Sequence, residues 1–600
     1  MRSTFSGLNT MVRGVFANQL SLDTVGHNIT NASTEGYSRQ AVNQAATRAL
    51  EVPSIYGGVL VGTGVDALSI QRARNIYADK QYWAETSTHE YYKAAQVNYD
   101  KLEAIFDDSD KTGILNAMEA FYSAWNDLSA NASTDSNRVT VIEKGNIFID
   151  KIDTAAAQIQ DQINAQYDDI RVHLSTINDI NDQIVELNKN IMGAEAVGAQ
   201  ANDLRDQRDL LVDELSTYMN INVYEDDKGM YTLVSNGISM VNGINKLTLE
   251  MSDPIANKDY GLNDYSIQIK ESGIAFIPQN GALRAELDTI AEDKAYIDKL
   301  ADMAAFMMTT FNNMHQQGVG IDGSDSEFGS YTVIGGAVTG NYNGPTYGIN
   351  FFGDDNTIYT WDESKKCVIA TELSGTDAIT RSWDVDVKTE NGVTTRTPIV
   401  KIEGTEYQTS ELKGMNIINA MKINTKITAT GGTSLIAARA FSVEQKVDDT
   451  GAIDTNTYIV KPNGTKDGTN AVNISTLFNL DVSNVVNAAI VRNSSDAGAT
   501  YVDFDTKARS IDKISLNAYY NSAMSQLGTD AKSIDTKESA QDDLITQIVN
   551  WRSSTSGVDW NEELTNMITF QKGYSACSRC LTTMDEMLDR LINSTGVVGR

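Results

Sequence analysis

Proline is scarce in this chain, and its distribution is uneven. Only six prolines occur among 600 residues, and none lies within 55–253 or 463–600. Because a proline in a helix interior costs about 3 kcal/mol, these stretches can form long helices. Glycine is distributed the other way, since 20 of the 43 glycines fall between Gly318 and Gly498. The two counts predict helical chain ends around a β-rich middle with many turns.

Basic charge, cysteine and long apolar runs are also in short supply. The 48 Lys and Arg are outnumbered by 80 Asp and Glu, giving a net charge of −32, which argues against nucleic acid or an anionic membrane as a partner. Three cysteines are too few for a disulfide framework. No run approaches a membrane span, and the N-terminus does not match a cleavable signal peptide. The expected partners are other proteins.

Residues that could build a catalytic or metal site are sparse. The chain has four histidines, and HEYYK at 89–93 begins like a zinc-protease motif but carries lysine in place of the second ligand. No phosphate-binding loop, dinucleotide fingerprint or nucleophile elbow occurs. Cys577 and Cys580 form a C-x-x-C pair, but zinc would need two further ligands. We therefore expect no enzyme activity, no cofactor and no metal.

Both chain ends carry apolar residues at helical spacing. The C-terminal stripe consists of Met567, Phe570, Tyr574, Cys577, Leu581, Met584, Leu588 and Leu591. The N-terminal stripe consists of Leu8, Met11, Val15, Leu22, Val25 and Ile29. Each could belong to an ordinary core helix, or to a helix pair that is completed only in an assembly. Two matching stripes at opposite termini favour the second interpretation.

The middle of the chain alternates between helical and β patterns. A heptad-like repeat over 157–191, a break at 193–200 and a second helix over 201–219 predict an antiparallel helical pair. Short strands are expected over 221–280 and a further helix over 281–317. From 318 to about 510 the pattern favours strands, and helix returns near 511.

Residues 28–40, NITNASTEGYSRQ, resemble the N-terminal signature of the bacterial flagellar rod, hook and hook-associated proteins. The matching positions are Asn28, Ile29, Asn31, Ala32, Thr34, Gly36 and Tyr37. A following run resembles the family's next stretch through Gly64, Val65, Leu68, Ile70 and Arg72. Three further segments resemble the larger hook-associated members of this family, namely ANDLRDQRDLLVDELS (201–216), GALRAELD (281–288) and 556–593.

This resemblance, together with the patterns, implies a mainly α fold with inserted β structure and a discontinuous domain order. We expect 1–74 with 556–600 to form a terminal helical assembly region of an inner tube. A helical rod domain would comprise 75–317 with 510–555, including the small β subregion near 221–280. Residues 318–509 would form a β-rich variable insert that faces outward. The polar turn after the first helix would separate the inner-tube helix from the outer layers.

The resemblance also implies a function. The chain is expected to be a structural adaptor between the flagellar hook and filament, exported through the flagellar type III system without a cleavable signal, and therefore extracellular. Its expected partners are further copies of itself in a ring, the hook protein, a second hook-associated junction protein, and an export chaperone on the C-terminal helix. Two alternatives are a hook or distal rod protein and an axial protein whose insert acts as an adhesin. An enzyme within the insert is disfavoured, because 318–509 contains no histidine.

Overall fold

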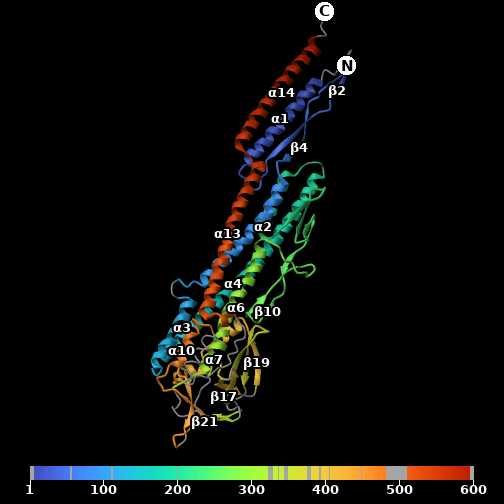
Figure 1. The fold of residues 1–600 in the computed structure, drawn as a ribbon. Helices are drawn as coiled ribbons and strands as arrows, with labels where there is room; N and C mark the ends of the chain where they lie inside the picture. The colour runs from blue at the N-terminus through green and yellow to red at the C-terminus, as the bar shows by residue number, and fades with distance from the viewer. Residues whose placement is uncertain are drawn as a thin grey trace, which may run out of the picture.

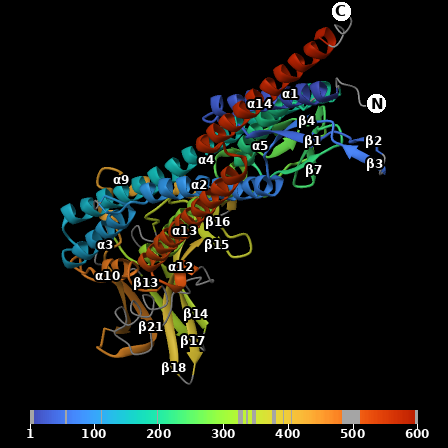
Figure 2. The same cartoon turned by 90° about the horizontal axis from the view of Figure 1, so that it is seen from above.

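The computed structural model describes residues 6–54, 57–109, 112–196, 198, 200–321, 329–334, 337–342, 349–373, 380–390, 393–403, 406–447, 449–481 and 510–594. In this part of the chain the protein is an elongated molecule with helices running along its length (Figure 1). The first and last helices lie together at one tip, and the middle of the chain lies at the other (Figure 2). The prediction of a mainly helical fold with inserted β structure is confirmed.

Helices make up most of the described chain. In order they are α1 (Ser6–Thr30), α2 (Ile76–Ile105), α3 (Ile114–Ala130), α4 (Asp135–Glu195), α5 (Asn202–Tyr218), α6 (Ala282–Phe306), the π-helical η1 (Met307–Phe311), α7 (Asn312–Gln316), α8 (Met415–Ala420), α9 (Thr425–Thr428), the 3-10 helix η2 (Gly432–Leu435), α10 (Thr469–Thr476), α12 (Ser510–Lys513), α13 (Leu516–Ser556) and α14 (Trp560–Ser594). The helix expected over 281–317 is therefore present, but it passes through a π-helical segment that the sequence pattern did not predict.

The strands fall into three groups along the chain. Near the N-terminus they are β1 (Gln40–Ala46), β2 (Leu50–Ser54), β3 (Gly57–Val61) and β4 (Val65–Arg72). The subregion expected near 221–280 contains β5 (Asn222–Glu225), β6 (Tyr231–Ser235), β7 (Ile238–Asn242), β8 (Asn245–Lys246), β9 (Leu249–Met251), β10 (Ile255–Asn257), β11 (Leu262–Asp264) and β12 (Ile267–Ile269). The middle of the chain contributes β13 (Gly329–Ile334), β14 (Ala337–Tyr342), β15 (Thr357–Asp362), β16 (Cys367–Leu373), β17 (Thr380–Glu390), β18 (Val393–Glu403), β19 (Glu406–Leu412), β20 (Phe441–Val447) and β21 (Ile453–Pro462).

The described strand pairs are antiparallel and form small sheets. β1 pairs with β4, and β2 with β3, so residues 40–72 form two ribbons beside α1. The order β5-β6-β7-β8 makes a four-stranded sheet along the rod, with the pairs β9–β12 and β10–β11 beside it. In the middle of the chain the sheets are β14-β13-β21-β20, β15-β16-β19 and β17-β18.

The rod is built around α4, which packs against α2, α3, α5 and α6. The predicted heptad positions of α4 are buried in its core, namely Ile159, Ile163, Tyr167, Ile170, Leu174, Ile177, Ile184 and Ile191, while Leu187 lies at the edge. α5 folds back along α4, because Arg205 near its start pairs with Glu195 at the end of α4 at 2.7 Å. The predicted antiparallel helical pair is therefore present.

The middle of the chain is joined to the rod by a shared hydrophobic core. Phe351 and Phe352 pack against Phe121 of α3 and Phe311 of η1. The rings meet in tilted or edge-to-face arrangements, with centroids 5.2–6.0 Å apart. Buried residues of α8 and α10 belong to the same core. Part of the segment that was expected to be an outward insert thus packs into the core at the end of the rod. The division into domains inferred from the sequence remains a prediction.

Candidate assembly region and its joint to the rod

The terminal helices α1 and α14 pack side by side, as both views show (Figures 1 and 2). Small residues let them approach closely. A Cβ atom on Gly14 would lie 2.9 Å from the sulfur of Cys577, and one on Gly7 would lie 3.0 Å from Cε of Met584. Gly573 of α14 faces Asn18 of α1 in the same way. Glycine at these positions is therefore part of the helix–helix interface.

The buried face of α1 differs from the apolar stripe predicted for it. Its buried residues are Gly14, Ala17, Ser21, Thr24, Val25 and Asn28. Of the predicted N-terminal stripe only Val25 is buried, and Leu8, Met11, Val15, Leu22 and Ile29 are half-buried. Small residues recur on this face every three or four positions. A prediction based on large apolar residues does not detect such a face.

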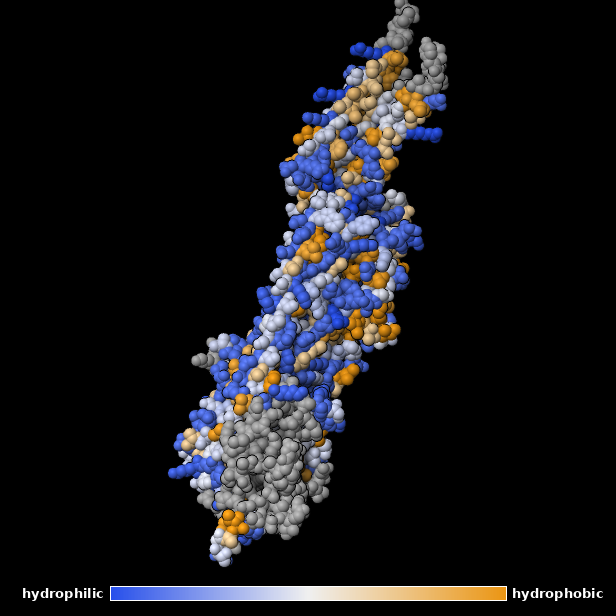
Figure 3. Space-filling view, viewed as in Figure 1, coloured by the Kyte–Doolittle hydropathy of each residue, from blue (hydrophilic) through white to orange (hydrophobic). Residues whose placement is uncertain are grey.

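The predicted stripe of α14 lies on the correct helix but is incompletely covered. Met567, Phe570, Cys577, Leu581, Met584 and Leu588 are half-buried, whereas Tyr574 and Leu591 are exposed. Other large apolar side chains here face solvent, including Phe16, Ile568, Met587 and Ile592, each more than half exposed. The space-filling view shows apolar atoms along this tip (Figure 3). The helix pair leaves substantial apolar surface unpartnered.

Asn28 is the centre of the signature segment. Its Nδ2 donates to the carbonyl of Gln40 at 2.8 Å and to Oε2 of Glu563 at 3.0 Å. Its Oδ1 accepts from the Gln40 amide at 2.9 Å and from the Tyr37 hydroxyl at 2.8 Å. This buried amide joins α1, β1 and α14, because it offers two N–H donors and an oxygen that can accept two hydrogen bonds.

The other signature residues shape the turn between α1 and β1. Asn31 closes it, since its Nδ2 donates to the His27 carbonyl at 3.0 Å and its Oδ1 accepts from Thr34. Gly36 has φ +74°, and a Cβ there would meet Leu210 of α5 at 3.2 Å. Ile29 and Ala32 are half-buried on the same turn. The structure thus brings the predicted signature residues together in one turn.

The start of α14 is tied to this turn by ionic contacts. Arg39 donates from Nε to Glu563 at 2.8 Å and from Nη2 to Glu562 at 2.7 Å. Its backbone amide also donates to the carbonyl of Ser556 at 2.8 Å. Burial, followed by the charges of Asp203, Asp206 and Glu563, raises the pKa of Tyr37 far above its ordinary value. Tyr37 therefore remains a neutral hydrogen-bond donor.

Four aspartates of α5 face this tip, at Asp203, Asp206, Asp209 and Asp213. Asp203 accepts from Gln40 of β1 at 2.9 Å, and the other three contribute to the joint between the tip and the rod. Their spacing of three or four residues places them along one face of the helix. Arg72, at the end of β4, donates from Nη1 to Asp206 at 2.6 Å and to Asp209 at 2.8 Å. Arg74 binds Asp79 of α2 at 2.8 Å and lies 3.4 Å from Asp209.

Arg552, near the end of α13, closes the joint from the C-terminal side. It lies 2.8 Å from Asp213 and 3.0 Å from Asp79, and its guanidinium stacks over the Tyr82 ring at 4.2 Å. The chain passes between tip and rod twice, once after β4 and once at the end of α13. At both places an arginine binds carboxylates of α5 and α2. We call Arg72, Arg74, Arg552, Asp79, Asp206, Asp209 and Asp213 the joint cluster.

Because the joint cluster is largely buried, the loss of one charge would strongly affect the carboxylates that remain. Asp209 is 1% exposed, and burial opposes its charge, but Arg74 and Arg72 hold its pKa below the ordinary value. Burial raises the pKa of Asp213 despite the opposing effect of Arg552. Removing one member of such a set leaves a buried charge uncompensated, at a cost of about 3–5 kcal/mol. The sequence pattern predicted a helix over 201–219 and a family resemblance over 201–216, but it did not predict these ion pairs.

Comparison with known proteins finds flagellar relatives for these elements. A model of the flagellar hook-associated protein FlgK helical domain matches residues 99–328, and a model of the flagellar basal body rod FlgEFG protein C-terminal region matches 552–594. The flagellar hook-associated protein 1 of Bacillus subtilis (strain 168) is 25% identical over 632 aligned residues, covering 100% of both chains. The chain is similar over its whole length to flagellar hook-associated protein 1.

Further relatives agree over nearly the whole length. The hook-associated protein 1 of Escherichia coli (strain K12) is 23% identical, covering 98% of this chain and 99% of that protein. A solved structure, the flagellar hook junction protein FlgK from Burkholderia pseudomallei, is 16% identical with a TM-score of 0.53 and covers 80% of this chain and 100% of that chain. This last likeness supports the fold.

These matches make the chain a structural component of the flagellum. The matched families and relatives are flagellar proteins, and no enzyme family is indicated. Among the described residues, no group of three or more His, Cys, Asp or Glu is placed to hold a metal ion. A search of the same residues finds no helix with the length and apolar character needed to cross a membrane.

Proposed function

We propose that this protein is the adaptor that joins the flagellar hook to the filament, and that it assembles by docking its terminal helices against neighbouring copies. The observation that carries this proposal is the uncovered apolar surface of α1 and α14. These helices are well formed and paired, yet the predicted stripe of α14 has no fully buried member. A helix of an ordinary core would have covered it.

Burial in an assembly supplies the driving force. Completing the burial of a half-exposed Leu, Ile or Met contributes about 1 kcal/mol. The candidates on α14 are Leu564, Ile568, Met587, Leu591 and Ile592, which are 44–64% exposed. Docking in a ring of copies would cover them, while the joint cluster keeps the rod in a defined direction relative to the tube.

The proposal includes an export route and partners. The chain would leave the cell through the flagellar type III system without a cleavable signal, and an export chaperone would cover α14 beforehand. In the flagellum it would contact the hook protein on one side and a second hook-associated junction protein on the other. Support comes from the position of α14, which packs on α1 at the tip and can be covered by a chaperone without opening the core of the rod.

A substitution in the α14 stripe tests the assembly mechanism. Leu581→Asp places a charge on a half-buried position, so we expect loss of filaments while the melting temperature of the monomer falls by only a few degrees. Ser533→Asp, on the exposed side of α13, is the matched control and should retain filaments. Electron microscopy of cells should show hooks without filaments for Leu581→Asp. Absence of hooks would instead indicate a rod or hook protein, and normal filaments would contradict docking through α14.

A further inference from the structure

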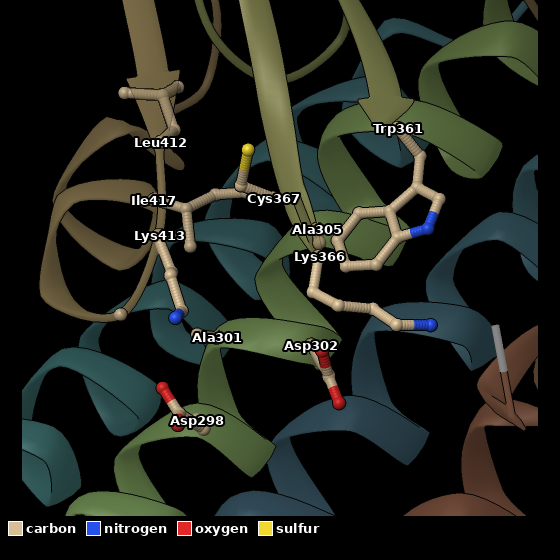
Figure 4. Close-up of a pocket in the computed structure, with 11 residues that line it drawn as sticks. Asp298, Ala301, Asp302, Ala305, Trp361, Lys366, Cys367, Leu412, Lys413 and Ile417 are labelled. Carbon is tan, nitrogen blue, oxygen red and sulfur yellow. The ribbon is translucent and has the colours of Figure 1, made fainter. Parts of the chain in front are cut away.

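A cleft lies where the middle of the chain meets the rod, between α6 and the sheet β15-β16-β19 (Figure 4). Its volume is about 300 Å³, which is at the lower end of the range for small-molecule sites. Ala301, Ala305 and Ile417 supply an apolar lining, and charged side chains stand around it. Nothing in the assembly mechanism uses this cleft.

The helix side of the cleft is acidic. Asp298 and Asp302 lie one turn apart on α6. Tyr260 donates to Oδ2 of Asp298 at 2.9 Å, and Tyr519 donates to Oδ2 of Asp302 at 2.7 Å. These tyrosine contacts hold both carboxylates in place. Burial raises the pKa of Asp298, and the charge of Lys413 partly opposes this.

The sheet side of the cleft is basic and aromatic. Figure 4 shows Lys413 facing Asp298 from across the cleft, while Trp361 and Lys366 lie on the other side of the view, nearer Asp302. The ammonium group of Lys366 pairs with Glu363, so Lys413 supplies the positive charge that faces Asp298. No ion pair within 4 Å joins Lys413 to Asp298 in the described chain, so the two opposite charges are separated by the cleft. Lys366 has φ +53° because it ends the tight turn between β15 and β16.

A ligand with only one charge would pair with the acidic side or the basic side of the cleft. The charged side chain on the opposite side would then be partly desolvated without a partner. A molecule that carries both charges satisfies both walls. We propose that this cleft binds a small zwitterion of the amino-acid class. Its ammonium group lies against Asp298, and its carboxylate lies against Lys413, which faces Asp298 across the cleft. Such a ligand would link α6 to the sheet and so stabilise the contact between the rod and the middle of the chain.

Calorimetric titration of the full chain tests this site, with L-alanine, ethylamine and propionate as probes. We expect saturable binding of L-alanine, and at least about tenfold weaker binding of ethylamine and of propionate, because each lacks one charge-assisted contact. Failure of L-alanine to bind saturably would overturn the proposal. Equal binding of L-alanine and ethylamine would also overturn it, since it would indicate a simple amine site.

Variants locate the binding. Asp298→Asn retains an acceptor for Tyr260, and Lys413→Met removes a charge that has no ion-pair partner in the described chain, so both variants should fold. Each should weaken L-alanine binding at least about tenfold. Glu292→Gln on α6 and Lys422→Met after α8, both exposed, are matched controls and should bind as the parent chain does. Unchanged affinity in Lys413→Met would overturn the assignment, whatever the stability of Asp298→Asn.

Discussion

At the scale of single residues, buried polar side chains fix how the elements of this molecule meet, because each makes specific hydrogen bonds to several of them. Asn28 joins three elements through four hydrogen bonds. A second buried set lies in the rod, where Asn98 of α2 and Gln162 and Gln166 of α4 surround Asp293 of α6. Asn98 Nδ2 donates to Asp293 at 2.9 Å, and both glutamine amides donate to its Oδ2 at 3.1 Å.

Asp293 makes the stability of the rod depend on pH. Burial raises its pKa to about 7, while the three amides and Lys101 oppose the shift. An unfolded aspartate titrates near 3.9. Between these two values the folded chain keeps a proton that the unfolded chain has released, so the stabilisation is fully present below pH 4 and is lost as the pH rises to about 7.

We therefore expect Asp293→Asn to stabilise the protein more at pH 8 than at pH 5.5. The difference between the two gains in the free energy of unfolding should be about 2 kcal/mol, measured by urea denaturation. The new amide could also donate to Oε1 of Gln166, which has no partner in the described chain. Equal gains at both pH values would show that Asp293 is ionised in the folded protein throughout this range.

At the scale of elements, the close contact of α1 with α14 depends on glycine. Gly14→Val would place side-chain atoms where the sulfur of Cys577 now lies, at a cost of about 1–3 kcal/mol. We expect faster amide exchange in α14, and partial recovery when Cys577→Ala is added. Gly26→Val is the control, because a Cβ there meets nothing within 4 Å. Equal effects of the two valines would indicate loss of helix propensity and not a steric clash.

The presence of a helix could be predicted where an apolar repeat is long. The patterns over 157–191 and 567–591 indicated α4 and α14, because apolar residues recur there every three or four positions, but α4 begins at Asp135, well before its repeat. The contact face of α1 was not predicted, since its interface consists of Gly14, Ala17 and Ser21 and carries little hydrophobic signal. The ion pairs of α5 also could not be predicted, because partners such as Arg72 and Arg552 are distant in sequence and only the fold brings them together.

At the scale of the whole molecule, the joint cluster sets the direction of the tip relative to the rod. Arg552→Met removes the ionic partner of Asp213, whose side chain is 17% exposed and still accepts from Trp83, so we expect a loss of about 1–3 kcal/mol at the joint. Distances between spin labels at Ser575 on α14 and Ser533 on α13 should then broaden. Arg590→Met, exposed on α14, should leave the distribution narrow. A narrow distribution in Arg552→Met would show that the joint is held by packing and not by charge.

The central claim is that the terminal helices are only partly stabilised in the free protein and become fully buried in the flagellum. Amide hydrogen exchange, measured on the monomer and on the assembled junction, tests this claim most directly. We predict strong protection of α2, α4 and α6 in both states, and protection of α1 and α14 that rises by orders of magnitude on assembly. Protection of α14 in the monomer equal to that of α4 would contradict the account.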